Sequence, residues 1–147
     1  MPGFTLVQRT SASPERVFDV LTDHRGYAAI TPLRKVELER AGDPAPNGVG
    51  AIRVLHAVGP PTREEVLVYD RPRRFSYKLL SGAPVRDHVG TVTLEPDGAG
   101  TRVVYTISTT PTVPFGGAAV VAVAKVAVGR LLKSIVAEAE RGVPVAA

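Results

Sequence analysis

The sequence of 147 residues contains no cysteine and no tryptophan, and only 5% of its residues are aromatic. Without cysteine, the chain has no disulfides, thiolate zinc sites, iron–sulfur clusters or cysteine nucleophiles. A chain of this length can remove roughly 68–70% of its unfolded surface from water, so it needs no covalent staple. We therefore expect residues 1–147 to form a single domain. The N-terminus has no basic stretch followed by an apolar one, which predicts a cytoplasmic protein.

Charge of one sign and long apolar runs are also scarce. The 18 lysines and arginines stand against 14 acidic residues, and the densest basic cluster, Arg71, Arg73 and Arg74, lies at a predicted turn. Nucleic-acid-binding domains show a longer basic stripe and a recognisable module, so we expect no nucleic-acid partner. The longest apolar stretch, 113–128, covers about 16 residues and contains Lys125, so we expect no integral membrane association.

Motifs for metal, nucleophile and phosphate chemistry are missing too. His24, His56 and His88 lie far apart and lack metal-ligand spacing. No Gly-x-Ser-x-Gly motif offers a serine nucleophile. The segment Gly48-Val49-Gly50 is too short for a dinucleotide fingerprint and reads as a hairpin turn. The sequence thus predicts neither a metal nor a cofactor.

What is present is a regular succession of strands and helices. A strand at 4–9 precedes Ser13-Pro14-Glu15, which offers an N-cap, a proline at the first helical position and an acid in the first turn. A second short helix is predicted at 27–30. The apolar period then changes to two, which predicts six strands at 35–40, 50–58, 63–69, 75–80, 88–95 and 101–109. Short connections make these strands antiparallel. A helix over 115–141 carries an apolar face of Val121, Ala124, Val128, Leu131, Leu132 and Ile135.

Four segments occur in a characteristic order: 13–18 after the first strand, 48–53, 65–72 leading into Phe75-Ser76-Tyr77, and 100–103. With this order of elements, the whole chain resembles the polyketide cyclase/dehydrase and lipid-transport family (SRPBCC proteins) of the START-like, birch-pollen-allergen-like superfamily. The resemblance implies an α+β helix-grip fold. In that fold a seven-stranded curved antiparallel sheet wraps round a long C-terminal helix, with two short helices after the first strand. The missing tryptophan departs from the family pattern.

The resemblance also implies an internal cavity between the sheet and the long helix, and the composition agrees with it. The chain has four Phe and four Tyr, and residues 115–128 are mostly Ala and Val, so these side chains leave space. A competing interpretation is that the helix packs closer to the sheet. In the strand 50–58, either of two faces could line the cavity: the face of Val54 and His56 or the face of Arg53 and Leu55. The side chains that we expect to bind a ligand are those of Tyr27, Ile30, Val54, His56, Phe75, Tyr77, Leu79, Arg86, His88, Val92, Val103, Tyr105, Phe115 and Val121.

Three functions fit these observations. The first is binding of a hydrophobic or amphipathic small molecule, such as a lipid, polyketide or isoprenoid. The second is a cofactor-free polyketide cyclase or dehydratase, in which His88 transfers a proton and Tyr77 or Tyr105 orients a carbonyl; His88 satisfied by a neighbour or by water is the competing interpretation. The third is a protein–protein module with a filled core and an exposed apolar patch. Neither the ligand nor the oligomeric state can be read from the sequence.

Overall fold

The computed structural model describes residues 3–23, 26–30, 33–57 and 59–141. The elements are, in chain order, β1 (Gly3–Thr10), α1 (Pro14–Thr22), α2 (Tyr27–Ile30), β2 (Lys35–Arg40), β3 (Ile52–His56), β4 (Thr62–Asp70), β5 (Arg74–Ser81), β6 (Val85–Asp97), β7 (Gly100–Pro111) and α3 (Gly117–Arg141). The predicted order is confirmed. The largest difference in a boundary is at β6, which begins at Val85 instead of His88; β3 is shorter than predicted, and α3 begins at Gly117 instead of Phe115.

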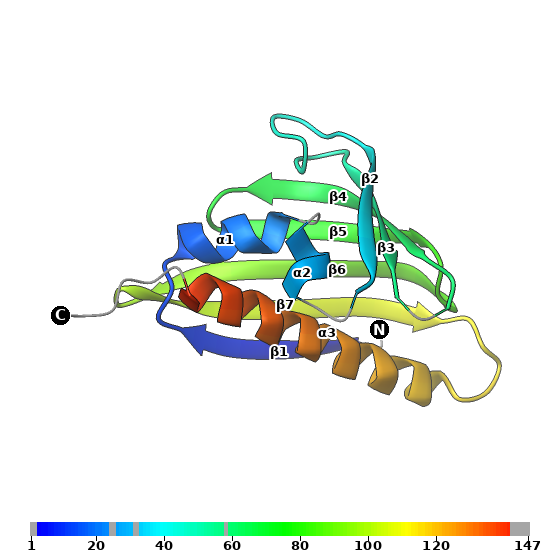
Figure 1. The fold of residues 1–147 in the computed structure, drawn as a ribbon. Coiled ribbons are helices and arrows are strands. Elements are labelled where there is room, and N and C mark those ends of the chain that lie inside the picture. Colours follow the sequence, from blue (N-terminus) through cyan, green and yellow to red (C-terminus); the bar gives the residue numbers. More distant parts are fainter. Residues whose placement is uncertain (1–2, 24–25, 31–32, 58, 142–147) are drawn as a thin grey trace.

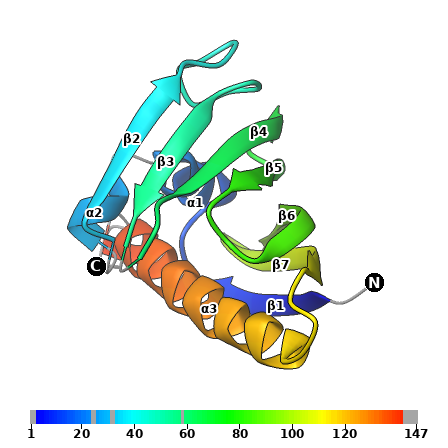
Figure 2. The same ribbon diagram turned by 90° about the vertical axis from the view of Figure 1, so that its right-hand side faces the viewer.

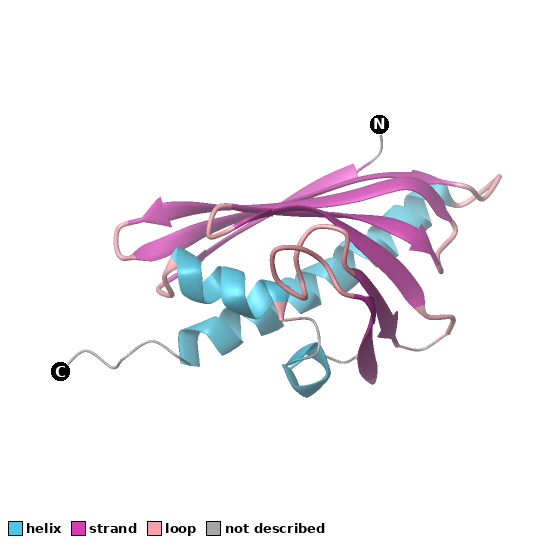
Figure 3. Cartoon of the chain, turned by 90° about the horizontal axis from the view of Figure 1, so that it is seen from above, coloured by secondary structure: helices cyan, strands magenta, loops and turns pink. Residues whose placement is uncertain are grey.

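The strands form one antiparallel sheet in the order β1-β7-β6-β5-β4-β3-β2. Hairpin connections place each of β2 to β7 beside its neighbour in sequence, while β1 pairs with β7 and so brings the start of the chain to its last strand. The three helices lie on the same face of the sheet (Figure 1, Figure 3). Figure 2 shows the sheet curling round this face and α3 running across the opening. The predicted helix-grip fold is confirmed.

Local signals at α1 fix its start and join it to the end of α3. The Ser13 hydroxyl accepts a hydrogen bond from the Arg16 backbone N–H at 3.2 Å, and Pro14 follows the cap, as predicted. The Arg16 guanidinium in turn donates to the carbonyl oxygens of Glu138 at 3.3 Å and Ala139 at 3.4 Å. These bonds satisfy carbonyls in the last turn of α3, which otherwise lack partners. They hold the two helices together at one end of the sheet.

The basic cluster at the β4–β5 turn supplies a second contact for α1. Arg71 donates from Nε and Nη2 to the two carboxylate oxygens of Asp19, at 2.8 and 2.9 Å. The Arg71 hydrogen bond holds the pKa of Asp19 below its usual value. Both side chains are about half exposed, so the pair contributes little to stability. Arg71 thus serves a local contact between a turn and a helix.

A filled core occupies the end of the sheet covered by α1. The Phe18 ring is fully buried and meets Tyr69 and Phe75 edge-on, with ring centroids 5.0 and 6.4 Å apart. Edge-to-face contacts of this kind are favourable beyond the area that they bury. From α3, the side chains that complete this core are Leu132, Ile135, Val136 and Ala139.

The surroundings of α3 change halfway along the helix. Every residue from Gly117 to Leu131 is half-buried or exposed, although the sequence remains apolar. Val123 is 70% exposed and Val126 is 55% exposed. Within the described ranges, no helix has the combination of length and apolar composition needed to cross a bilayer. The first half of α3 borders the cavity that is described in the next subsection.

Candidate functional site

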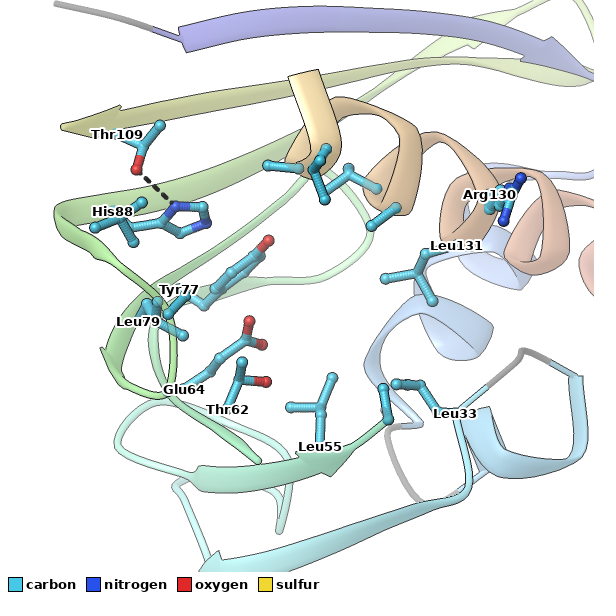
Figure 4. Close-up of a pocket in the computed structure, with 18 of the residues that line it drawn as sticks. Leu33, Leu55, Thr62, Glu64, Tyr77, Leu79, His88, Thr109, Arg130 and Leu131 are labelled. Carbon is cyan, nitrogen blue, oxygen red and sulfur yellow. Dashed lines mark hydrogen bonds between the residues drawn. The ribbon is translucent and has the colours of Figure 1, made fainter. Parts of the chain in front are cut away.

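A cavity of about 760 Å³ lies between the first half of α3 and the concave face of the sheet. Figure 4 shows side chains of the strands, among them Tyr77, Glu64 and Leu55, projecting toward Leu131 on α3. The sheet contributes most of the polar groups, and the residues that α3 contributes are apolar except for Arg130. From α3 the lining residues are Ala119, Val120, Val123, Ala124, Ala127, Val128, Arg130 and Leu131.

Apart from Arg130 and Leu131, the helix wall consists of the short apolar side chains of alanine and valine. Because alanine and valine extend only a short distance toward the sheet, their side chains do not fill the space between the two layers, and a cavity results. Residues 82–84 of the β5–β6 connection, Val85 at the start of β6 and Pro60 also line the cavity. Val123 both lines the cavity and is largely exposed, which places it at the mouth.

The sheet wall contains an ion pair between neighbouring strands. Arg53 of β3 donates to Oε1 of Glu64 of β4 from Nε at 3.0 Å and from Nη2 at 2.8 Å. The side chains are 3% and 13% exposed, respectively. The Arg53 guanidinium also lies over the ring of Tyr77, 4.8 Å from its centroid, and over that of Phe75, at 5.2 Å. Breaking such a buried pair by removing one partner costs about 3–5 kcal/mol, so each charge depends on the other.

A pair of tyrosine hydroxyls lies beside the ion pair. The hydroxyl oxygens of Tyr77 and Tyr105 are 2.5 Å apart and hydrogen-bonded. Gly90 makes this arrangement possible, because a Cβ at that position would lie 2.4 Å from Cζ of Tyr77. Burial raises the pKa of both tyrosines, and nearby Glu64 acts in the same direction. Both hydroxyls therefore stay protonated at neutral pH. Since one O–H suffices for the bond between them, the pair retains a second O–H to donate.

His88 completes the polar wall from β6. Its Nδ1 is 2.9 Å from the Thr109 hydroxyl oxygen, and the other ring nitrogen is directed into the cavity (Figure 4). Burial lowers the pKa of His88, and Glu64 opposes this shift. The imidazole is therefore neutral at pH 7, because its ordinary pKa is already 6.5. A neutral ring held at Nδ1 offers Nε2 as an acceptor or donor, depending on its tautomer.

Several of the residues predicted for the site lie on the cavity wall. Burial also raises the pKa of Tyr27, whose hydroxyl donates to the carbonyl oxygen of Leu21. Ile30 ends α2, and its side chain, like all of His24, lies outside the described part of the chain. The predicted residues that line the cavity are Tyr27, Phe75, Tyr77, Leu79, His88 and Tyr105.

The predicted facing of β3 is wrong. Val54 and His56 point to the outer face, where His56 Nε2 lies 3.2 Å from Oε2 of Glu37. The opposite face, carrying Arg53 and Leu55, lines the cavity. The physical reason is the partner available on each side: Arg53 meets Glu64 inside, whereas His56 meets Glu37 outside.

The placement of Arg86 is corrected by an irregularity in β6. Strict alternation would put Arg86 on the same face as His88, but the pairing of β6 with β7 shifts register between Arg86 and Val89. Asp87 adopts a φ of 51° at this bulge, a conformation that aspartate tolerates better than most residues. As a result Val85 and His88 line the cavity and Arg86 is exposed.

Four apolar predictions also lie away from the cavity. Phe115 is 90% exposed because it precedes the first turn of α3. Val121 is half-buried on another side of α3, since the cavity meets the face that carries Val120. Val92 and Val103 are buried in the filled core, under the end of the sheet that α1 and the last turns of α3 cover.

Arg53 and Glu64 are two charged residues of the cavity wall that our sequence reasoning missed. A signal was available, because Arg53 alternates with Leu55 and Glu64 alternates with Val66. Opposite charges in the inward phase of consecutive antiparallel strands indicate a cross-strand pair on the core face. Among the described residues, no three His, Cys, Asp or Glu side chains gather as a metal-binding group.

Comparisons with solved structures find the same fold in other proteins. A START superfamily protein from Mycobacterium smegmatis has a TM-score of 0.81 at 14% identity, over 95% of this chain and 97% of that one. Ara h 8.0201 has a TM-score of 0.79 at 13% identity, over 96% and 99%. The Zhui aromatase/cyclase of a Streptomyces species has a TM-score of 0.71 at 24% identity, over 98% and 96%. At these identities the structures share the fold only.

The sequence comparisons give the family. No curated protein sequence matches the chain. Residues 1–140 match the family described as polyketide cyclase / dehydrase and lipid transport. The match spans the strands of the sheet and nearly all of α3, including every residue that lines the cavity. The protein therefore belongs to the polyketide cyclase/dehydrase and lipid-transport family.

Proposed function

We propose that the protein binds a hydrophobic or amphipathic small molecule, such as a lipid, polyketide or isoprenoid, in the cavity under α3. The observation that supports this most directly is the space itself, about 760 Å³ with an apolar helix wall and a few polar groups on the sheet wall. Small-molecule sites typically have volumes of about 300–1,000 Å³ and this division between apolar and orienting groups. Membership of the family agrees with the proposal.

The alternative of a protein–protein module requires a filled core and an exposed apolar patch. Exposed apolar side chains do occur on the first half of α3, at Val123 and Val126. The space beneath that half is not filled, however. A hydrophobic ligand accounts for both features, since a cavity and its mouth are then expected in one place.

The test is uptake of N-phenyl-1-naphthylamine, a neutral apolar fluorophore whose emission rises in apolar surroundings. The wild type should bind it with a saturable rise in emission. Ala124→Phe places a ring in the cavity and should lower the affinity at least about tenfold, since the probe loses buried contact area. Ala122→Phe adds the same ring on the exposed side of α3, outside this cavity, and should bind like the wild type. Absence of saturable binding to the wild type would refute the proposal.

A cofactor-free cyclase or dehydratase is the second candidate, favoured by the position of His88. A neutral imidazole with one nitrogen held by Thr109 and the other facing the cavity can accept a proton from a carbon next to a carbonyl. The tyrosine pair, which stays protonated, can donate its remaining O–H to that carbonyl. The proton taken by His88 can then be returned to the oxygen that leaves as water, which balances a dehydration.

This candidate is tested with a poly-β-ketone thioester surrogate, whose cyclised and dehydrated products are separated by mass spectrometry. His88→Ala should abolish product formation and leave binding of N-phenyl-1-naphthylamine within about twofold of the wild type. His56→Ala, on the outer face of the sheet, is the matched control and should keep both properties. Equal product formation by the wild type and His88→Ala would exclude His88 as the proton acceptor.

A further inference from the structure

The ion pair on the cavity wall leaves one carboxylate oxygen unused. Two hydrogen bonds from Arg53 converge on Oε1 of Glu64. Across the residues that the structure describes, no donor is hydrogen-bonded to Oε2 of Glu64, and the carboxylate is directed into the space between the strands and α3 (Figure 4). A carboxylate oxygen in such a place accepts a hydrogen bond strongly, because little water competes for it.

The charges of the pair restrict what Oε2 can accept. Arg53 and Glu64 together are neutral, and a second cation on Oε2 would lie close to the Arg53 guanidinium, which repels it. An anionic ligand would meet the carboxylate itself. Among the other titratable side chains that line the cavity, His88 and the three tyrosines, Tyr27, Tyr77 and Tyr105, are neutral at pH 7. The Arg130 guanidinium belongs to α3, across the cavity from this wall (Figure 4). A neutral hydrogen-bond donor is the group that fits, and in the proposed ligand classes of lipid, polyketide and isoprenoid that donor is a hydroxyl.

We infer that Glu64 is the residue that selects the ligand, and that the ligand is a neutral apolar molecule with at least one alcoholic or phenolic hydroxyl. The hydroxyl donates to Oε2 of Glu64. Arg53 is a positioning residue, because its two N–H groups hold Oε1 and orient the carboxylate toward the cavity. This inference rests on the proposed small-molecule binding and adds the class of ligand to it.

The experiment compares two probes of similar size, 2-naphthol and 2-methoxynaphthalene, which differ in having or lacking the hydroxyl proton. At pH 7 both are neutral, and their affinities are measured by fluorescence titration. The wild type should prefer 2-naphthol by at least about tenfold, the value of one hydrogen bond to a charged acceptor. Glu64→Gln should lower the affinity for 2-naphthol about tenfold and leave that for 2-methoxynaphthalene within about twofold.

The control and the second variant isolate Glu64 from effects on folding. Glu65→Gln alters the next residue of β4, which faces outward and contacts Arg40 at 3.0 Å and Lys78 at 3.5 Å, and should keep the wild-type preference. If Glu64→Gln does not fold, the double variant Arg53→Met with Glu64→Leu decides, since replacing both charges by apolar groups is tolerated better than removing one. It should bind both probes with equal affinity.

The outcomes separate this inference from the proposal beneath it. Loss of the preference in the Glu64 variant, with 2-methoxynaphthalene still bound, supports the inference. A wild type that binds both probes equally, or a Glu64 variant that keeps the preference, overturns the inference and leaves small-molecule binding in place. A wild type that binds neither these probes nor N-phenyl-1-naphthylamine overturns both.

Discussion

The two halves of α3 differ in sequence and in surroundings. The second half buries Leu132, Ile135, Val136 and Ala139 in a core with aromatic partners. The first half is richer in Ala and Val, with ten among residues 117–131 against three among residues 132–141, yet it covers a cavity and leaves Val123 and Val126 largely exposed. Composition of the helix therefore does not decide which part of it is buried. What decides is the structure opposite each half.

At the filled end, large side chains and a second helix meet α3. Phe18 of α1 and Phe75 of β5 pack there, and Arg16 binds the carbonyl oxygens of the last turn of the helix. At the cavity end, the sheet wall opposite α3 includes two hydrogen-bonded polar pairs, Arg53 with Glu64 and His88 with Thr109, and all four residues belong to strands. The protein thus separates the part that stabilises the fold from the part that can accept a ligand.

The largest effect should come from removing a core side chain at the filled end. Ile135 is fully buried, so Ile135→Ala should lower the free energy of unfolding by about 2–5 kcal/mol through lost burial and a cavity that neighbours cannot fill. Val120→Ala, on the cavity wall, should cost less than about 1 kcal/mol, because that side chain already borders empty space. Urea denaturation measures both. Equal losses would show that the two halves contribute alike to stability.

An intermediate effect should follow from adding volume at matched alanines. Ala139 is fully buried, so Ala139→Leu should destabilise the protein by about 1–3 kcal/mol through overpacking. Ala124 faces the cavity, so Ala124→Leu should change the free energy of unfolding by less than about 1 kcal/mol. Thermal unfolding of the two variants provides the comparison. A large loss for Ala124→Leu would mean that the cavity end does not accept extra volume.

The smallest effect concerns acid sensitivity at the cavity end. Burial lowers the pKa of His88 below 6.5, so near that pH the unfolded chain binds more protons at this residue than the native protein does. The stability contributed by neutral His88 is therefore present above pH 6.5 and is lost as the pH falls through that value toward the lower native pKa. His88→Gln should reduce the drop in melting temperature between pH 7.5 and pH 5. An unchanged drop in melting temperature would contradict a lowered pKa of His88 in the native protein.

Much of the site could be predicted where strand alternation is regular. In β5, Phe75, Tyr77 and Leu79 share one face, and all three line the cavity as the period of two requires. Prediction failed where the period is interrupted or ambiguous. Because of the bulge in β6, Val85 lines the cavity and Arg86 does not. The bulge is a change of register with β7, which no local sequence pattern reveals. In β3 both faces carry apolar side chains, and only the contact of Arg53 with Glu64 decides between them.

By itself, the sequence determined the order of elements, the antiparallel sheet, the cap of α1 and the family. These features depend on local spacing, turn residues and hydrophobic period, which neighbouring residues impose on one another. Only the tertiary structure decided that one half of α3 packs on the filled core while the other half covers the cavity. It also decided that Oε2 of Glu64, which has no hydrogen-bond donor among the described residues, lies at that cavity. Those outcomes depend on which side chains meet across the curved sheet, and the residues concerned lie far apart in the chain.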